Sequence, residues 1–354
     1  MANFISFQPS DYISTKLYTG NATTNAITGV GFTPAFSWFK SRSNTNSHAI
    51  FDVLRGTNSI SPSNNSINYN ASGDGFTSLD SDGYTFNGSG GGGGVNASGY
   101  TYVGWNWAAG TTSGLSGGTI TPINYSYSST ARISVVAYTG NGTSGATVPH
   151  GLGVKPAAMW VKNTSGSVNS WAVYHQAMTA TSYLELDVTN AKASNAGRWN
   201  NTEPTTTLFS LGDSDTTNGS GNTYIAYIFG ESSGFSRFTQ YTGTGNADGP
   251  YIHCNFQPAW LMIKETDSSS GWCMYDNQRP ESNPGYWNVN ENFLQANDTG
   301  VESNNSNLAV DFTATGFKVR NSAGDINGDG NNYVVFAFAS NPMVSSNSKA
   351  GTAR

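Results

Sequence analysis

The sequence predicts an all-β protein made of three tandem antiparallel β-sandwich domains. Composition is the first reason: only 11% of the 354 residues are charged and 42 are Gly, yet 13% are aromatic. Aromatic and β-branched runs separated by Gly, Asn and Ser are typical of β-sandwiches. No stretch of about a dozen residues shows the apolar spacing of an amphipathic helix. The second reason is that the chain repeats itself three times.

Three phrases return in the same order in each repeat. The opening phrase, Tyr-Thr-Gly-Asn or Tyr-Thr-Gly-Thr, stands at 18–21, 138–141 and 241–244. A Pro-Ala phrase ending in Lys follows at 34–40, 156–162 and 258–264. A closing phrase follows at 96–99, 218–221 and 327–330, with a Tyr three positions later. The openings are roughly 100–120 residues apart, which is the size of a domain and too long for a solenoid repeat.

The repeats define the expected organisation. They occupy 15–110, 132–232 and 233–342, after an N-terminal arm at 1–14 and before a polar tail at 343–354. The segment 111–131 is rich in Ser, Thr and Gly, so we expect a flexible linker there. Almost no linker separates the second repeat from the third, so these two are expected to move as a pair. The arm is expected to dock or to add an edge strand.

Strands follow from superposing the copies. An apolar strand begins within each Pro-Ala phrase, with Phe36 and Trp38 on one parity in the first copy and Ala158 and Trp160 in the second. The last strand of each repeat alternates in the same way, as Val103, Trp105, Trp107; Ile225, Tyr227, Phe229; and Val334, Phe336, Phe338. A period of two places one face of a strand on a core. Roughly six strands per repeat are enough for a two-sheet sandwich.

Charge and apolar patterning exclude several classes. The net charge is −6 and the Lys and Arg residues do not cluster, so nucleic-acid binding is not expected. No run approaches 18 apolar residues, so no membrane insertion is expected. The first residues lack the basic and apolar regions of a signal peptide. Cys254 and Cys273 fall in the third repeat, where two buried thiols are favoured over a disulfide.

One segment of the third repeat has the spacing of a metal loop. Asp325, Asn327 and Asp329 match the first half of an EF-hand calcium loop, but Phe336 stands where that loop needs a bidentate Glu. The other two copies lack the carboxylates. A tight hairpin is therefore favoured, calcium at these three residues is the alternative, and no other cofactor is expected.

No arrangement of residues predicts an enzyme. Glu185 and Asp187 resemble the catalytic strand of concanavalin-like glucanases, but Asn190 stands where a second carboxyl is needed. The four His residues lie at unrelated points of their repeats, without metal-ligand spacing.

One segment offers the chemistry of sugar binding. Arg198, Trp199, Asn200 and Asn201 lie between strands of the second repeat and have no counterpart in the other two. A Trp face can stack on a sugar ring while flanking amides bond its hydroxyls. These four residues are the candidate carbohydrate site, and a partly buried loop Trp is the alternative.

Four phrases together resemble a known family. They are Tyr138-Thr139-Gly140-Asn141, the stretch from His150 to Pro156, the stretch from Asp311 to Phe317, and Ala339-Ser340-Asn341-Pro342. In this order they resemble repeat-bearing structural proteins of tailed bacteriophages of marine bacteria, including cyanophages. The resemblance covers nearly the whole chain. It implies concanavalin-like or jelly-roll sandwiches built into virions as tail fibres or other appendages, and it supplies no catalytic residues.

The resemblance leads to a functional expectation. The chain is expected to be a non-enzymatic virion protein, in a tail fibre, a tail appendage or a capsid-surface decoration. It would assemble in the host cytoplasm with other virion proteins and with copies of itself, and act at the virion surface, where it could aid host attachment. The N-terminal arm and first repeat are expected to dock on the particle while the other repeats project outward. The alternative is a lectin-like adhesin that binds host surface glycans.

Overall fold

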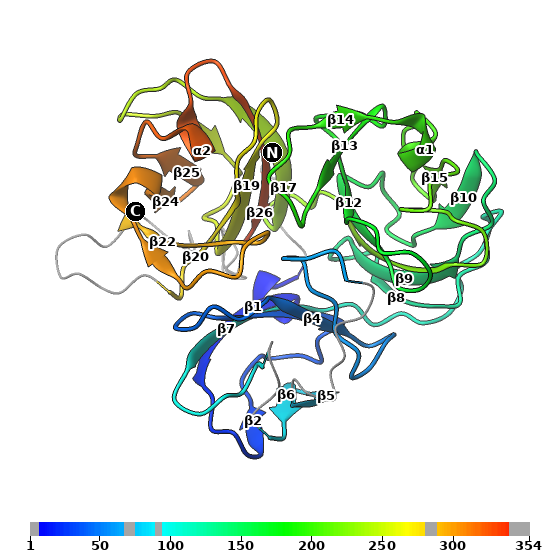
Figure 1. Cartoon of the computed structure of the whole chain (residues 1–354), viewed down its shortest axis with the longest axis horizontal. Helices are drawn as coiled ribbons and strands as arrows, with labels where there is room; N and C mark the ends of the chain where they lie inside the picture. Colours follow the sequence, from blue (N-terminus) through cyan, green and yellow to red (C-terminus); the bar gives the residue numbers. More distant parts are fainter. Residues whose placement is uncertain (1–6, 67–74, 89–93, 280–288, 340–354) are drawn as a thin grey trace.

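The computed structural model describes residues 7–66, 75–88, 94–279 and 289–339. It is almost entirely β, as predicted, and every strand pair in it is antiparallel. Each repeat forms one larger sheet, here called the inner sheet, and one smaller outer sheet. Figure 1 shows the three repeats arranged around a common centre, with the first in blue, the second in green and the third in yellow to red. No helix of the described residues is long and apolar enough to cross a membrane.

The first repeat has the simplest inner sheet. In spatial order this sheet is β1 (Ile13–Thr19), β7 (Thr101–Trp107), β3 (Phe36–Ser41) and β4 (Ala49–Asp52). Its outer sheet is β2 (Asn25–Ile27), β6 (Gly83–Phe86) and β5 (Phe76–Asp80). A 3₁₀ helix, Pro9–Asp11, leads into β1.

The second and third repeats keep this plan with extra edge strands. The second inner sheet is β14 (Ala193–Ser194), β13 (Ser182–Glu185), β12 (Ala172–His175), β11 (Ala158–Asn163), β16 (Thr223–Phe229), β9 (Ile133–Thr139) and β8 (Asn124–Ser128); its outer sheet is β10 (Ala146–Pro149) and β15 (Leu208–Leu211), beside α1 (Ala196–Trp199). The third inner sheet is β17 (Ser236–Thr242), β26 (Asn332–Phe338), β19 (Trp260–Glu265), β20 (Trp272–Asp276), β22 (Asn292–Gln295) and β23 (Ser303–Asn304). The third outer sheet is β18 (Tyr251–His253), β25 (Gly316–Val319), β24 (Val310–Thr313) and β21 (Val289–Asn290), with α2 (Gly324–Asn327) and a 3₁₀ helix, Ser306–Leu308, nearby.

Both faces of the central strands of each inner sheet are buried, which the alternating pattern did not predict. One parity faces the outer sheet of the same repeat and forms three separate apolar clusters. The other parity, which carries the predicted alternation, forms a single large cluster shared by all three repeats. All six residues of β3, β11 and β19 are consequently buried.

The shared cluster, called the central core, is built in matching layers. Strand register places Phe36 beside Trp107, Ala158 beside Phe229 and Trp260 beside Phe338 in one layer. The next layer pairs Trp38 with Trp105, Trp160 with Tyr227 and Met262 with Phe336. Rings meet across repeats: Trp38 lies 5.6 Å from Trp160, and Trp107 lies 5.4 Å from Trp260, both edge to face. Edge-to-face pairs of aromatic rings add stabilising energy beyond that of the apolar area they bury.

The predicted flexible linker is wrong. Within 111–131, residues 124–128 form β8, which pairs along β9, and Thr111 bridges to Tyr127. Ile120 is buried in the apolar cluster of the second repeat. All three repeats contribute to the central core, so the first repeat is not a separate unit joined to the other two by a flexible linker.

The N-terminal arm is predicted as an anchor on the particle, yet its described part packs within the chain. The Phe7 ring lies 5.0 Å from that of Tyr12 and 5.3 Å from that of Phe235, at the start of the third repeat. The arm therefore ties the first repeat to the third.

Candidate functional site

The side chains that define the repeats serve folding. In each repeat the Tyr of the opening phrase stacks on the Tyr that follows the closing phrase, with ring centroids 4.9–5.2 Å apart. The Asn of the closing phrase is fully buried in all three copies, at positions 96, 218 and 327. The Asn218 side chain accepts a hydrogen bond from the Asn141 N–H and donates to the carbonyls of Thr143 and Gly212. Its amide thus replaces the backbone partners that the two phrases would otherwise lack.

The candidate calcium residues lie in this same arrangement. The Asn327 Oδ1 accepts from the Thr244 N–H at 2.8 Å, and its Nδ2 donates to Asn246 and Asn321 carbonyls. Asp325 accepts from the Ser270 hydroxyl at 2.8 Å. No group of three or more His, Cys, Asp or Glu residues in the described part of the chain is placed to hold a metal ion. Asn327 is therefore occupied as a structural amide.

The candidate sugar site is closed at its centre. Trp199 is 1% exposed and packs in the apolar cluster of the second repeat, so its ring offers no free face for a sugar to stack on. Arg198 is also buried, with its guanidinium 3.3 Å from Glu185 and over the Tyr183 ring. Only Asn200, in a left-handed helix-ending position, and Asn201 are near the surface. The stacking role predicted for Trp199 is corrected accordingly.

Two buried thiols and two carboxylates complete the sequence-predicted residues. Cys254 and Cys273 are both free and buried, as the favoured reading predicts. Asp187 accepts from the Trp171 N–H at 2.8 Å. Burial raises the pKa of both Glu185 and Asp187. Glu185 forms its ion pair with Arg198, which is a structural role.

Three buried lysines occupy the same place in the three repeats and were not predicted as a group. Lys40, Lys162 and Lys264 end the Pro-Ala phrases and are at most 1% exposed. Lys162 donates to the Asn65 carbonyl of the first repeat at 2.9 Å, and Lys264 to the Thr189 carbonyl of the second at 3.1 Å. Burial lowers the pKa of each lysine to about 8. Each bond between repeats ties one repeat to the one before it.

A polar corner also links each repeat to the next. Asp52 and Arg55 of the first repeat form a buried ion pair, and the Tyr227 hydroxyl of the second donates to Asp52 at 2.7 Å. Asp276 and Arg279 repeat this in the third, where the Trp105 indole of the first repeat donates to Asp276 at 2.8 Å.

The second repeat changes both partners of this corner. His175 takes the place of the Asp, and the residue facing it in the third repeat is Phe336, with ring centroids 5.0 Å apart. Phe336 has no donor for a carboxylate, and a buried unpaired carboxylate is costly. Burial lowers the pKa of His175 to about 4, so it is neutral at neutral pH. These residues match one another across the junction and leave no group free for chemistry.

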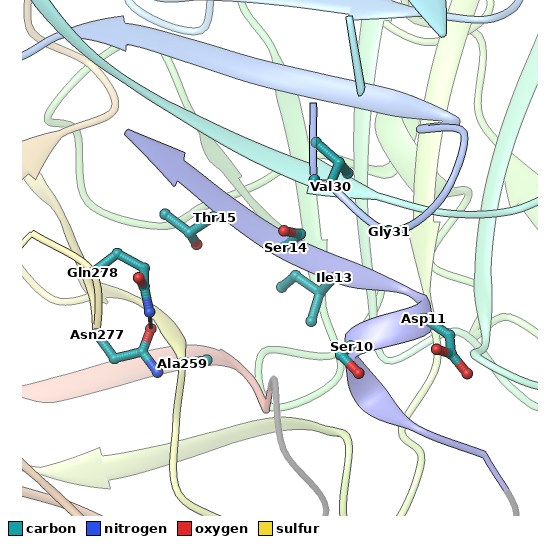
Figure 2. A pocket seen from close by; sticks show the side chains of 11 residues that line it. Ser10, Asp11, Ile13, Ser14, Thr15, Val30, Gly31, Ala259, Asn277 and Gln278 are labelled. Atoms are coloured by element: carbon teal, nitrogen blue, oxygen red, sulfur yellow. Dashed lines mark hydrogen bonds between the residues drawn. The ribbon is translucent and has the colours of Figure 1, made fainter. Parts of the chain in front are cut away.

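An open pocket lies at the junction of the first and third repeats. It has a volume of about 460 Å³ and lies between the start of β1 and the loop after β20. Figure 2 shows Ile13 and Val30 on its apolar side and Asn277 and Gln278 opposite. The remaining lining residues are Ser10, Asp11, Ser14, Thr15, Gly29, Gly31 and Ala259.

The polar groups that line the pocket are mainly hydrogen-bonding amides and hydroxyls. Asp82 fixes the loop on one side by accepting the Gly29 and Gly31 N–H groups at 2.9 and 2.6 Å, and these bonds lower its pKa. Asn277 and Gln278 bond to each other through their amides at 3.0 Å. The lining holds one carboxylate, that of Asp11, and no His, Cys or Lys. The pocket is suited to binding polar or backbone groups rather than to acid–base catalysis.

Residues 8–342 match the family described as "Domain of unknown function (DUF7483)". No curated protein matches the chain.

Proposed function

The chain belongs to the DUF7483 family, whose function is unknown, and we propose that it is a non-enzymatic structural protein of a bacteriophage virion. Its place would be a tail fibre, a tail appendage or a capsid-surface decoration. It would assemble through contacts with other virion proteins and with copies of itself. Each repeat would be a jelly-roll or concanavalin-like sandwich.

The observation that carries this proposal is the use of the repeated side chains. The stacked Tyr pairs, the buried Asn residues, the three lysines and the polar corners are all bonded within the chain. Groups committed in this way are unsuited to turnover. Hydrogen bonds between side chains of different repeats at each junction make a rigid three-repeat body, which is suited to a structural component of a particle.

Mass spectrometry of purified virions, followed by cryo-EM localisation, tests the proposal. We expect the chain to copurify with virions of a phage that encodes it and to fill density on the tail or capsid surface. Detection only in the infected-cell lysate, with none in particles, would contradict a structural role.

A lectin-like adhesin is the second candidate, and its support is the polar pocket rather than Trp199. A glycan array with the intact protein tests this alternative. Signal that is lost in the Asn277→Ala, Gln278→Ala double variant and kept in Asn201→Gly would favour the adhesin.

A further inference from the structure

The pocket between the first and third repeats runs along an edge of a sheet. Among the described residues, β1 pairs only with β7 and is the terminal strand of the first inner sheet. Ile13 and Thr15 of β1 line the pocket, and Asn277 and Gln278 lie opposite them (Figure 2). An edge strand presents unpaired N–H and C=O groups that can pair with another strand.

The backbone of Thr15 faces the pocket rather than its own sheet. Register against the last strand of each repeat makes Thr15 equivalent to Val135 and Phe238. The Phe238 N–H donates to Glu231 at 3.0 Å and its carbonyl accepts from Gln176 at 2.7 Å, both on the side away from β26. By the same geometry the N–H and C=O of Thr15 point away from β7. Neither group forms a hydrogen bond within the described part of the chain.

In the second repeat a strand covers the equivalent edge. β8 runs antiparallel to β9 and places Ser126 opposite Val135. The N–H and C=O of Tyr127 bond to Thr111 on the other side of β8, so the N–H and C=O of Ser126 face β9. A five-residue extended segment therefore fits this edge.

In the third repeat a side chain covers the edge instead. Gln176 and Asn277 occupy equivalent positions, directly after the polar-corner residue of their repeats. Gln176 reaches the Phe238 carbonyl of the next repeat, as described above. Asn277 is one methylene shorter, and its side chain accepts from the Gln278 amide at 3.0 Å. The edge of β1 thus has neither the strand of the second repeat nor the side-chain contact of the third.

We propose that this edge binds an extended segment of a partner protein as an added antiparallel strand. The pocket has β1 on one side and the Asn277-Gln278 loop on the other, so it admits one free strand and not the edge of a folded sheet from a second copy (Figure 2). Its lining has no aromatic ring on which a sugar could stack, which favours a peptide over a glycan. Backbone hydrogen bonds would supply the affinity, as in other cases of strand addition.

Charge and the contacts of β8 define the chemistry of the partner. Asp11 is the one charged residue of the lining and lies just before β1, where the C-terminal end of an antiparallel partner would come. A Lys or Arg at that end of the partner would complement this carboxylate. Asn124 of β8 donates to the Leu54 carbonyl at 3.4 Å, and Gln278 holds the Leu54 position in the third repeat. An amide side chain near the N-terminal end of the partner is therefore also expected.

A peptide that copies β8 tests the site. The probe is a fluorescent peptide of residues 123–129 with Ser129→Lys, blocked at both ends, and its binding to the full chain is measured by fluorescence anisotropy. We expect saturable binding that slows hydrogen exchange at the Thr15 amide. N-methylation of Ser126 in the peptide removes the N–H that would bond to β1 and should weaken binding about tenfold. N-methylation of Tyr127, whose N–H faces away, is the matched control and should leave binding unchanged.

Two variants of the chain show where the peptide binds. Asn277→Gln copies the second repeat, so its amide should bond to the Thr15 carbonyl and weaken binding about tenfold. Asn190→Gln makes the same change at an exposed position and should have no effect. Asp11→Asn should weaken the Lys peptide about two- to fivefold at low salt and leave the peptide with Ser129 unchanged.

Several results would overturn the proposal. These are no binding of the peptide, equal binding after N-methylation of Ser126, or binding of glycans in place of the peptide. Slow exchange of the Thr15 amide before the peptide is added would show that the edge is already covered, by a second copy if protection rises with protein concentration and by the same chain if it does not. A strand-binding edge suits the assembly role proposed above, but binding is measured with the purified chain, so either idea can fail without the other.

Discussion

At the scale of single residues, the buried Asn of each closing phrase shows why the repeats persist in sequence. Three backbone groups from two distant loops meet one amide, and only Asn offers both an acceptor and two donors at this length. The Gly of the opening phrase lies against the backbone of the closing phrase, so any side chain there would collide. The opening and closing phrases are therefore held together by this Asn side chain and by close packing of their backbones.

Asn218→Ala should lower the free energy of unfolding by about 3 kcal/mol, because buried backbone groups would lose their partners. Urea denaturation followed by Trp fluorescence measures this loss. Asn190→Ala, at an exposed position, is the matched control and should change stability by less than about 0.5 kcal/mol. Similar losses in both variants would contradict the buried-amide role.

The three lysines should make stability depend on pH above neutrality. Their folded pKa of about 8 lies below the unfolded value near 10.4. The cost of burying the charge is present below pH 8 and is relieved as pH rises, so stability from these groups should increase between about pH 8 and 10. Lys162→Met should reduce this slope by up to about 1.4 kcal/mol per pH unit. Urea titrations from pH 7 to 10 measure it, and Lys155→Met at the surface is the control.

At the scale of elements, the open edge strands of the sheets determine which segments of the chain become additional strands. The segment 111–131 has the composition of a linker, but β8 within it covers the edge of β9. Composition could not show this, since Ser and Thr fit both linkers and edge strands. The repeats, the positions of the shared strands along the chain and the parity of the last strand could be predicted because three copies constrained one another. Trp199 has no counterpart, so its burial had no internal check, and the pocket residues come from four separate stretches that share no pattern.

The segment that holds β8 should resist proteolysis. Chymotrypsin is expected to cleave slowly at Tyr125 and Tyr127 in the native protein, because both residues lie in a paired strand. Gly151→Ala should speed cleavage there, since Gly151 has a φ of 72° and a Cβ at this position would meet the Tyr127 ring. Gly153→Ala, with a similar φ of 70° but open space around it, is the control. Rapid cleavage of the native chain at these two residues would instead support the interpretation of this segment as a flexible linker. Mass spectrometry of the fragments identifies the cut.

At the scale of the whole molecule, one core joins what the sequence divides into three. Alternation shows that a strand face is buried, but not which neighbour buries it. A signal for the second buried face is present in β26, where Val334, Val335 and Phe336 are apolar at both parities. A strand buried on both faces has this continuous pattern.

Trp160→Ala should therefore destabilise all three repeats together. A large aromatic lost from a packed core costs about 3–5 kcal/mol, and this ring contacts residues of the first and third repeats. Hydrogen exchange should accelerate in the inner sheets of every repeat, with a single unfolding transition. Phe209→Ala, inside the second repeat's own cluster, is the comparison and should act most strongly on that repeat. Acceleration confined to the second repeat in both variants would show independent domains.

The central core also sets an order of events during synthesis. The ribosome delivers Trp107 long before its third-repeat partners in β19 and β26 emerge. The part of the first repeat's apolar face that packs on the third repeat therefore stays exposed to water for nearly two thirds of the translation time. Nascent chains stalled in this interval are exposed to mutual sticking. Because the three repeats share one core, we expect incomplete chains to bind a chaperone through that face or to aggregate. Premature-stop products should therefore accumulate in inclusion bodies.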